Sequence, residues 1–460
     1  MADRMGSMLL QFVINLILAR LLTPGDFGAV GMLAIFIAVS NVLIDGGFAS
    51  ALIQKKNTTQ QEWSTIFYWN LGISVLFYAL LFFAAPHVAA YFRMPVLSGV
   101  LRGIGLTLIL GAMSAIPLNR LRKQFEFKTI AIGNLSAYII AGSVATAMAF
   151  TGFGVWSLVV MQVLQMLVTL LVFTLLTRWH PSLCFSTETL RSLFGYGGYL
   201  LGANILQEIA KNLQGIIIGR RFSASAMGYY TQAYKLDRIT SYSLPQVIVQ
   251  VMFPLYSSMQ DDLPALRSML LRNVRIIAFL VFPVMGMLIL VAPSLIDFLY
   301  GEKWLPAVPY FRILCVAGMF ACLQNINYYA VAARGKSRAL FLWSIYKWSC
   351  LLVALLAGAQ LGGMYGIMWA MVASEANIYL VNAALASHYT GLEVFRQILA
   401  LLQVLLVVAL SFGAGWLTLS FGGAVSGALV FVAAFLVLSR LMRLSALSDS
   451  LVFVRKLLKK

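Results

Sequence analysis

Polar side chains interrupt one strongly apolar stretch of the chain at helical spacing. Asn204, Glu208, Lys211 and Gly215 recur at intervals of three and four residues, which places them on one stripe of a helix. An ionisable group inside a bilayer costs on the order of 3 kcal/mol or more, so such groups face a water-filled cavity or pair with one another. Two interpretations stay open. Either Glu208 and Lys211 neutralise each other as a structural pair, or the stripe lines a cavity that binds a polar ligand.

A second stripe combines aromatic rings with a guanidinium group. In the segment GYYTQAYKLDRITSY, residues 228–242, helical spacing places Tyr230, Tyr234, Arg238 and Ser241 on one face. Aromatic rings stack on sugars, and a guanidinium group binds phosphate in a bidentate manner. The segment is therefore a candidate wall of a binding cavity for a phosphate-bearing glycan. The alternative is that the tyrosines form an interfacial aromatic belt.

Further candidates lie in other apolar segments. Arg20 ends the first segment, with Asn15 near it, and Arg220 ends the seventh. These residues can draw an anionic cargo into a cleft, or the two arginines can extend to lipid headgroups. Lys347 and Glu375 lie in the eleventh and twelfth segments, where a mutual pair is the default interpretation.

The sequence carries few signs of catalysis or cofactor binding. It has no Walker A loop, and His87, His180 and His388 are isolated from any second ligand at metal spacing. The four cysteines have no paired spacing and are expected to be reduced, structural thiols. We therefore predict a protein that is not an enzyme and that holds no metal or cofactor.

The composition predicts an integral membrane protein. The 460 residues are 61% hydrophobic and only 10% charged, and about 20 apolar residues suffice for one transmembrane helix. The first segment follows a charged start but no small-residue cleavage pattern, so we expect it to be retained. The pattern predicts an all-α fold of about fourteen transmembrane helices, at residues 6–22, 27–53, 64–85, 97–117, 129–151, 154–176, 196–218, 228–253, 275–292, 310–331, 340–361, 365–386, 398–418 and 423–442.

The positive charge is distributed unevenly among the predicted loops. Most lysines and arginines fall in alternate loops, so the positive-inside rule places both termini in the cytoplasm. A net charge of +18 would suggest nucleic acid as the partner of a soluble protein, but here membrane topology and anionic lipid headgroups explain it better. No nucleic-acid partner is expected, and the basic tail LVFVRKLLKK is expected to lie on the inner leaflet.

An internal repeat appears when the chain is shifted by about two hundred positions. LARLLTPGDFGAVG then overlies IGRRFSASAMGYYT, with Arg20 on Arg220, Thr23 on Ser223 and Gly28 on Gly228. Six segments separate the copies, which predicts a parallel repeat about an axis along the membrane normal. The predicted domains are a six-helix lobe at 1–176, a cytoplasmic linker at 177–195, a second six-helix lobe at 196–386, and a helix pair with its basic tail at 387–460.

Helix breakers fall at corresponding places in the second and eighth segments. Gly46 and Gly47 in the first copy correspond to the region of Pro245 in the second. Paired interruptions indicate a hinge or a binding site at one depth of the membrane. Tolerated kinks are the alternative.

Four stretches in order carry a family resemblance. LARLLTPGDFGAVGMLAI, IIIGRRFSASAMGYYTQAYKL, MFPLYSSMQDDLPALRSMLLR and LYGEKWLPAVPYFRIL resemble the Wzx-type polysaccharide flippases of the multidrug/oligosaccharidyl-lipid/polysaccharide exporter superfamily. The branch that includes the colanic acid exporter is the most similar. The resemblance covers about residues 18–315.

The resemblance implies an alternating-access flippase of the bacterial inner membrane. Its implied cargo is an undecaprenyl-pyrophosphate-linked oligosaccharide, moved from the cytoplasmic to the periplasmic leaflet for exopolysaccharide, capsule or O-antigen synthesis. It also implies coupling to a H⁺ or Na⁺ gradient or to the membrane potential, with a polysaccharide polymerase and chain-length machinery as partners. The implied cationic ligands are Lys211, Arg238, Arg20 and Arg220.

Two other functions stay open as alternatives. A multidrug or metabolite antiporter of the same superfamily needs an acid within the membrane, and Asp45, Glu208 or Glu375 could serve. A polymerase or ligase of the glycan pathway needs a large periplasmic loop, and the longest predicted outer loop, about 293–309, is too short for one.

Overall fold

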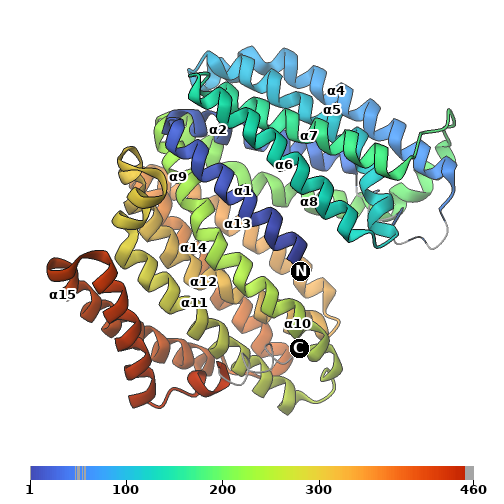
Figure 1. The fold of residues 1–460 in the computed structure, drawn as a ribbon. Helices are drawn as coiled ribbons and strands as arrows, with labels where there is room; N and C mark the ends of the chain where they lie inside the picture. The colour runs from blue at the N-terminus through green and yellow to red at the C-terminus, as the bar shows by residue number, and fades with distance from the viewer. Residues whose placement is uncertain (1, 47, 49–51, 54, 56–57, 451–460) are drawn as a thin grey trace. The chain divides into compact units, whose positions relative to one another are not determined.

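The structure, a computed structural model, describes residues 2–46, 48, 52–53, 55 and 58–450 (Figure 1). Gly47 and the basic tail at 451–460 lie outside the described residues. The described chain is helical, and it divides into two units at residues 1–228 and 229–460.

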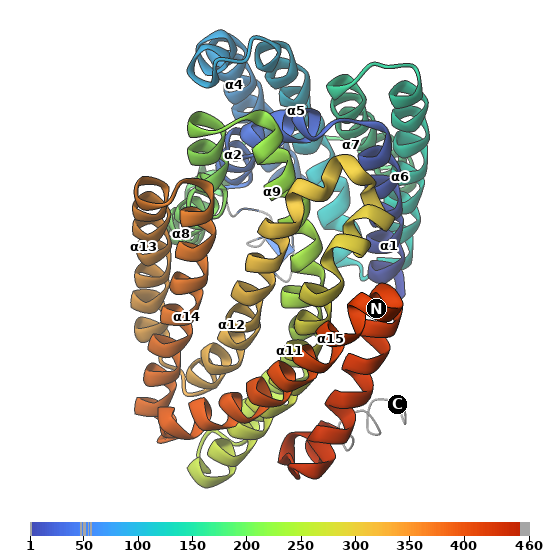
Figure 2. The same cartoon turned by 90° about the vertical axis from the view of Figure 1, so that its left-hand side faces the viewer.

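The first unit is a bundle of long helices. α4 packs along α5, α5 along α7, α6 on both α7 and α1, and α2 against α8 (Figures 1 and 2). The helices are α1 (Ala2–Leu21), α2 (Pro24–Asp45), α4 (Gln60–Phe92), α5 (Val96–Lys123), α6 (Phe127–Phe150), α7 (Val155–Thr177) and α8 (Thr187–Arg221), followed by the first turn of α9.

The second unit is built around α12, which packs against both α11 and α14. α13 packs on α14, and α15 on α11. Its elements are α9 (Ala224–Arg238), the π-helix η1 (Ile239–Ser243), α10 (Leu244–Ser258), α11 (Leu263–Tyr300), the 3₁₀-helix η2 (Glu302–Ala307), α12 (Val308–Ala333), α13 (Ser337–Leu361), α14 (Gly363–Thr390) and α15 (Val394–Leu441). Gly423, at φ 72°, breaks α15 into two helices.

Among the described residues, ten helices are long and apolar enough to cross a membrane. The expected all-α, multi-pass membrane protein is therefore confirmed. Each of the fourteen predicted segments overlaps a helix. The count of fourteen spans stays a prediction, because helices such as α8 and α9 carry the polar stripes that lower their hydropathy.

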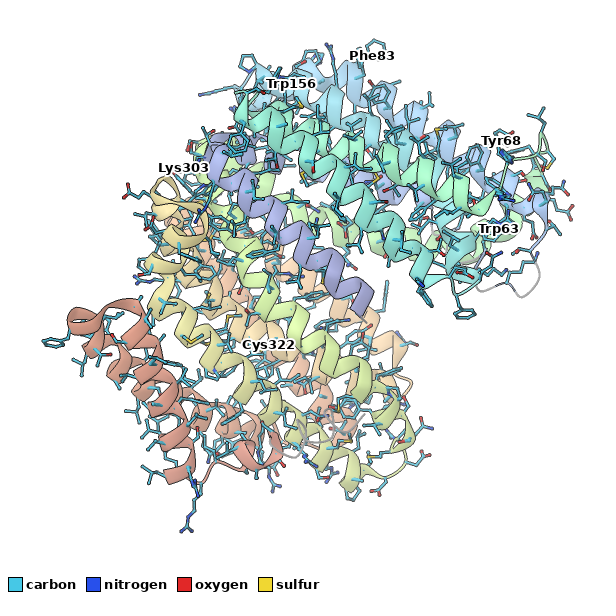
Figure 3. All side chains as sticks on the ribbon, viewed as in Figure 1. Trp63, Tyr68, Phe83, Trp156, Lys303 and Cys322 are labelled. Atoms are coloured by element: carbon cyan, nitrogen blue, oxygen red, sulfur yellow. The ribbon has the colours of Figure 1, made fainter. Side chains whose placement is uncertain are left out.

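Aromatic residues mark both ends of the first unit. Figure 3 shows Trp156 and Phe83 near one end of its helices, with Trp63 and Tyr68 near the other. Tryptophan and tyrosine are enriched at the two membrane–water interfaces. Trp156 is exposed, as an interfacial position requires, whereas Trp63 is buried in a cluster of apolar side chains.

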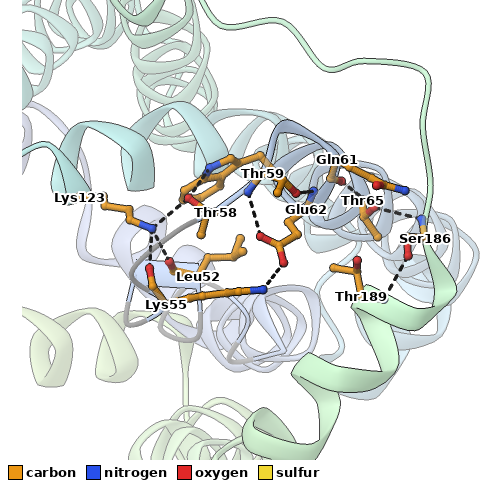
Figure 4. Close-up of polar contacts among 11 residues, drawn as sticks. Leu52, Lys55, Thr58, Thr59, Gln61, Glu62, Thr65, Lys123, Ser186 and Thr189 are labelled. Carbon is orange, nitrogen blue, oxygen red and sulfur yellow. Dashed lines mark hydrogen bonds and ion pairs between the residues drawn. The ribbon is translucent and has the colours of Figure 1, made fainter.

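A polar cluster fixes the start of α4 (Figure 4). The Thr59 hydroxyl accepts from the Glu62 backbone N–H, and the Glu62 carboxylate accepts from the Thr59 backbone N–H at 2.9 Å and from Lys55. The Lys123 ammonium donates to the Leu52 and Lys55 carbonyls, at 3.2 and 2.7 Å, and to the Thr58 hydroxyl at 2.9 Å. All three of its protons are thus used.

The segment after α7 is bound to the same helix end. The Trp179 indole donates to the Gln60 side chain at 2.8 Å, and the Gln60 amide donates to the His180 carbonyl at 2.8 Å. The Ser182 and Ser186 backbone N–H groups donate to hydroxyls of α4 at 3.0 and 3.1 Å. The first part of the predicted linker, 177–195, is therefore anchored to the first unit.

The two aligned turns meet in reciprocal backbone contacts. A Cβ on Gly28 would lie 1.7 Å from the Ala224 carbonyl oxygen, and a Cβ on Gly228 would lie 1.9 Å from that of Pro24. Each turn also has a hydroxyl cap at the aligned position, because Thr23 accepts from the Asp26 N–H at 3.3 Å and Ser223 from the Ala226 N–H at 3.1 Å. Both helices therefore start in the same way and cross where only glycine fits. The predicted domain boundaries themselves stay a prediction.

Candidate functional site

The polar stripe of α8 forms a compact network. Lys211 Nζ lies 3.0 Å from one oxygen of the Glu208 carboxylate, and the Asn212 amide donates to the other at 3.2 Å. The Lys211 and Glu208 side chains are 40% and 25% exposed. Asn204 lies one turn before Glu208 and is partly exposed. The pairing that the sequence left open is therefore present, and it stays accessible to solvent.

A pocket of about 300 Å³ opens beside this network. Its polar lining consists of Asn41 from α2, Gln162 from α7, and Glu208 and Asn212 from α8. Aliphatic side chains of α2 and Ile104 of α5 form the rest. Gln162 and Asn41 were not among the residues predicted from the sequence, because a single amide in an apolar segment has no spacing signal.

In the second unit, α9 carries the predicted aromatic and cationic face. The Tyr230 and Tyr234 rings stack with centroids 5.6 Å apart at an interplanar angle of 21°. The Arg238 guanidinium lies 5.6 Å from the Tyr234 ring centroid and 4.2 Å from that of Tyr242. Among the residues that the structure describes, no carboxylate lies within ion-pair distance of Arg238. The rings therefore hold the guanidinium in place without neutralising it.

A chain of buried and partly buried polar groups lies in the same unit. The Lys347 ammonium donates to the Gln324 side-chain oxygen at 2.8 Å, and the Gln324 amide donates to Glu375. Asn382 donates to the Gln324 backbone carbonyl at 2.6 Å. The Gln324 side chain thus links Lys347 to Glu375. Sequence reasoning missed this bridge, although Gln324 and Asn325 are polar residues in an otherwise apolar segment.

Asp237 on α9 faces α12. Its carboxylate accepts from the Ser241 hydroxyl at 3.0 Å, and its other oxygen would lie 2.5 Å from a Cβ on Gly318. Asp237 also interacts electrostatically with Arg238 and Glu375. The cation and the two acids therefore share one polar region of the second unit.

The predicted arginines of the repeat lie at helix ends. Arg20 is in the last turn of α1 and Arg220 in the last turn of α8, and both are exposed. A cation in the last turn is favourable, because the helix dipole places partial negative charge there. The Arg220 guanidinium lies 4.9 Å from the Tyr91 ring centroid. Asn15 is partly exposed on α1. Their binding roles stay predictions.

Both predicted interruptions coincide with irregular backbone. α2 ends at Asp45, and Gly46 takes a left-handed conformation at φ 56°. In the second unit, the π-helix Ile239–Ser243 directly precedes the turn with Pro245. Single π-helical turns occur often at functional sites, and proline removes one helical hydrogen bond. The hinge role of Gly46, Gly47 and Pro245 stays a prediction.

The fold has a close match among solved structures. The lipid II flippase MurJ, in an inward closed conformation, superposes with a TM-score of 0.73 over 96% of this chain and 98% of its own, at 12% identity. The chain therefore has the fold of this flippase and is an integral membrane protein.

Two curated relatives cover most of the chain. Teichuronic acid biosynthesis protein TuaB of Bacillus subtilis is 24% identical over 372 residues, 80% of this chain and 77% of its own. Lipopolysaccharide biosynthesis protein WzxC of Escherichia coli is 25% identical over 357 residues, 76% of this chain and 72% of its own.

The family model described as "Polysaccharide biosynthesis protein" matches residues 17–309. The chain belongs to this family, whose members are transporters and not enzymes. The expected Wzx-type family and the expectation of a transporter are thereby confirmed, whereas the colanic acid branch stays a proposal at this level of identity.

Proposed function

We propose that the protein translocates an undecaprenyl-pyrophosphate-linked oligosaccharide from the cytoplasmic to the periplasmic leaflet of a bacterial inner membrane by alternating access. The family match over residues 17–309 supports glycan export as the pathway. The proposal includes fourteen spans, two six-helix lobes with an additional helix pair, and both termini in the cytoplasm.

One observation carries the proposal: Arg238 is stacked on tyrosine rings and has no ion-pair partner among the described carboxylates. A guanidinium group that no ion pair neutralises favours a phosphate group, to which it donates two parallel hydrogen bonds. Tyr234 is partly exposed and provides a flat surface on which a sugar ring stacks, whereas Tyr230 is buried against it. We therefore assign Arg238 to the pyrophosphate and Tyr234 to the first sugars.

Lys211 has a different part in the proposal. Its charge is compensated by Glu208 at 3.0 Å, so a phosphate would have to compete with an existing pair. The exposed Arg20 and Arg220 act at helix ends, where they attract the anionic head before it binds.

The experiment is complementation of a deletion strain. Arg238→Gln should lower surface polysaccharide about tenfold or more, because a charge-assisted hydrogen bond contributes about 1.5–3 kcal/mol. Arg238→Lys keeps the charge but loses the planar fork, so it should give intermediate export. Arg396→Gln, on an exposed arginine 3.2 Å from Glu393, is the matched control and should export normally.

Glycan analysis of the carrier gives the second measurement. In the Arg238→Gln strain, unpolymerised carrier-linked glycan should accumulate on the cytoplasmic leaflet while the protein remains in the membrane. Full export by Arg238→Gln would remove this residue from the model. Carrier that reaches the periplasm without being polymerised would place the defect in the polymerase that acts next.

The partly buried acid Glu375 is the observation that favours the rival function, a multidrug or metabolite antiporter. A cationic substrate needs a carboxylate in the membrane, and Glu375 interacts electrostatically with Lys347 and Arg238. Overexpression that confers drug resistance while a deletion leaves surface glycans unchanged would favour this function. The colanic acid branch is tested by asking whether the chain restores that polymer in a strain lacking its exporter.

A further inference from the structure

Ala34 and Ala38 of α2 are among the residues that line the pocket of the first unit. Under the shift of about two hundred positions, they correspond to Tyr234 and Arg238 of α9. In α9, the Tyr234 ring stacks on Tyr230 and lies beside the Arg238 guanidinium. In α2, the same two positions border an open volume of about 300 Å³.

The polar lining of this pocket carries no uncompensated positive charge. Glu208 is the charged residue among the lining side chains, and Lys211 at 3.0 Å balances it. A dianionic pyrophosphate would meet a carboxylate here, so like-charge repulsion opposes its entry. The pocket is therefore unsuited to the anionic part of a lipid-linked glycan.

The same lining suits hydroxyl groups. Asn41 and Gln162 each offer an amide donor and an acceptor, and each oxygen of the Glu208 carboxylate keeps acceptor capacity beyond its one hydrogen bond. Asn41 is exposed, so its amide is open to a ligand. Aliphatic side chains, among them Ile37, provide the apolar wall that the C–H face of a sugar ring contacts.

We propose that this pocket is a subsite for an uncharged sugar of the cargo, separate from the phosphate ligands. The inference rests on the proposed function and deepens it. A volume of about 300 Å³ is at the small end of the range for ligand pockets. The subsite therefore holds one or two sugar residues and selects the cargo by its hydroxyl pattern.

A protection assay tests the proposal on the purified full-length chain in a sugar-free detergent. Ala38→Cys places a thiol in the pocket, and peptide-resolved mass spectrometry follows its reaction with N-ethylmaleimide beside the four native cysteines. The probes are dodecyl maltoside, which has an uncharged disaccharide head, and dodecyl phosphate, which has an anionic head on the same tail. We expect dodecyl maltoside to protect the thiol and dodecyl phosphate not to protect it.

Side-chain variants then identify the lining groups. Gln162→Ala should raise the half-protecting concentration of dodecyl maltoside about fivefold, as expected for one lost hydrogen bond. Gln165→Ala removes the same amide from the same helix outside the pocket lining and should leave protection unchanged. Asn41→Ala provides a second variant at an exposed position, where the fold does not depend on packing.

The outcomes separate this inference from the proposed function. Equal or better protection by dodecyl phosphate, or equal effects of Gln162→Ala and Gln165→Ala, would overturn the sugar subsite even if export is normal. Two results together would support the subsite and refute the flippase function. Dodecyl maltoside would protect the thiol selectively, and deletion of the protein would leave all surface glycans intact.

Discussion

The crossing of Gly28 and Gly228 makes a quantitative prediction about stability. Gly28→Ala would place a Cβ 1.7 Å from the Ala224 carbonyl oxygen, and Gly228→Ala would place one 1.9 Å from that of Pro24. A carbon and an oxygen approach to about 3.3 Å in close packing. Either substitution therefore forces the two helix starts apart by roughly 1.5 Å.

The cost follows from what must move. The atoms that obstruct the new methyl group belong to the backbone, so no side chain can rotate away from it. The free energy of unfolding should therefore fall by about 3 kcal/mol, the upper end of the range for overpacking. Alanine recovers about 1 kcal/mol of helix propensity. The net loss is about 2 kcal/mol, which lowers the melting temperature by roughly 5 °C for a unit of this size.

The double variant distinguishes this explanation from two separate defects. Once one alanine has separated the helices, the second Cβ enters space that is already open. The double variant should therefore melt close to the single variants, whereas independent sites would give additive losses. Gly111→Ala is the control, because nothing lies within 4 Å of its Cβ.

The assay is thermal unfolding of the purified chain in detergent, followed by intrinsic fluorescence. Single variants that melt within about 1 °C of wild type would show that the helices do not touch here, since that shift corresponds to less than 0.5 kcal/mol. An additive double variant would refute the shared contact.

Three further changes test the polar contacts. Lys123→Met removes three hydrogen bonds at the start of α4 and should cost about 2 kcal/mol, seen as a lower melting temperature than that of Lys128→Met. Trp179→Phe keeps an aromatic ring near Phe67 but loses the hydrogen bond to Gln60, so the free energy of unfolding should fall by about 1 kcal/mol. Trp179→Ala also loses the ring, and the same unfolding assay should show a loss of about 3–5 kcal/mol. Gln324→Leu removes the bridge between Lys347 and Glu375 and should reduce the yield of monodisperse protein; Gln324→Glu, which adds an acid beside Glu375, should reduce it further.

The helices and the aligned turns could be predicted because their signals are local. A long apolar run specifies a membrane helix regardless of its neighbours. The hydroxyl caps at Thr23 and Ser223 follow from the residues beside them. The close approach at Gly28 and Gly228 could be anticipated as a correspondence in the sequence, but not as a contact.

The bridging residues could not be predicted, because their roles depend on tertiary neighbours. Gln324 links two charges that lie on α13 and α14, and no spacing along α12 reveals this. Gln162 and Asn41 become lining groups only because α2, α7 and α8 enclose a common space. The interpretation of Lys211 also needed the structure, since the sequence allowed both a structural pair with Glu208 and a cavity-lining role.

The two copies of the repeat are alike at the turn and different on the face that follows. At the turn, each glycine meets backbone from the other copy, so a side chain in either copy disturbs the contact for both. Beyond it, Ala34 and Ala38 stand where Tyr234 and Arg238 stand in the second copy. Mutual contact therefore preserves the shape of the turn, whereas the faces that follow it carry unlike residues. One face lines a pocket with amide and carboxylate groups and the other presents a stacked guanidinium, a division that matches the uncharged glycan and the anionic head of the proposed cargo.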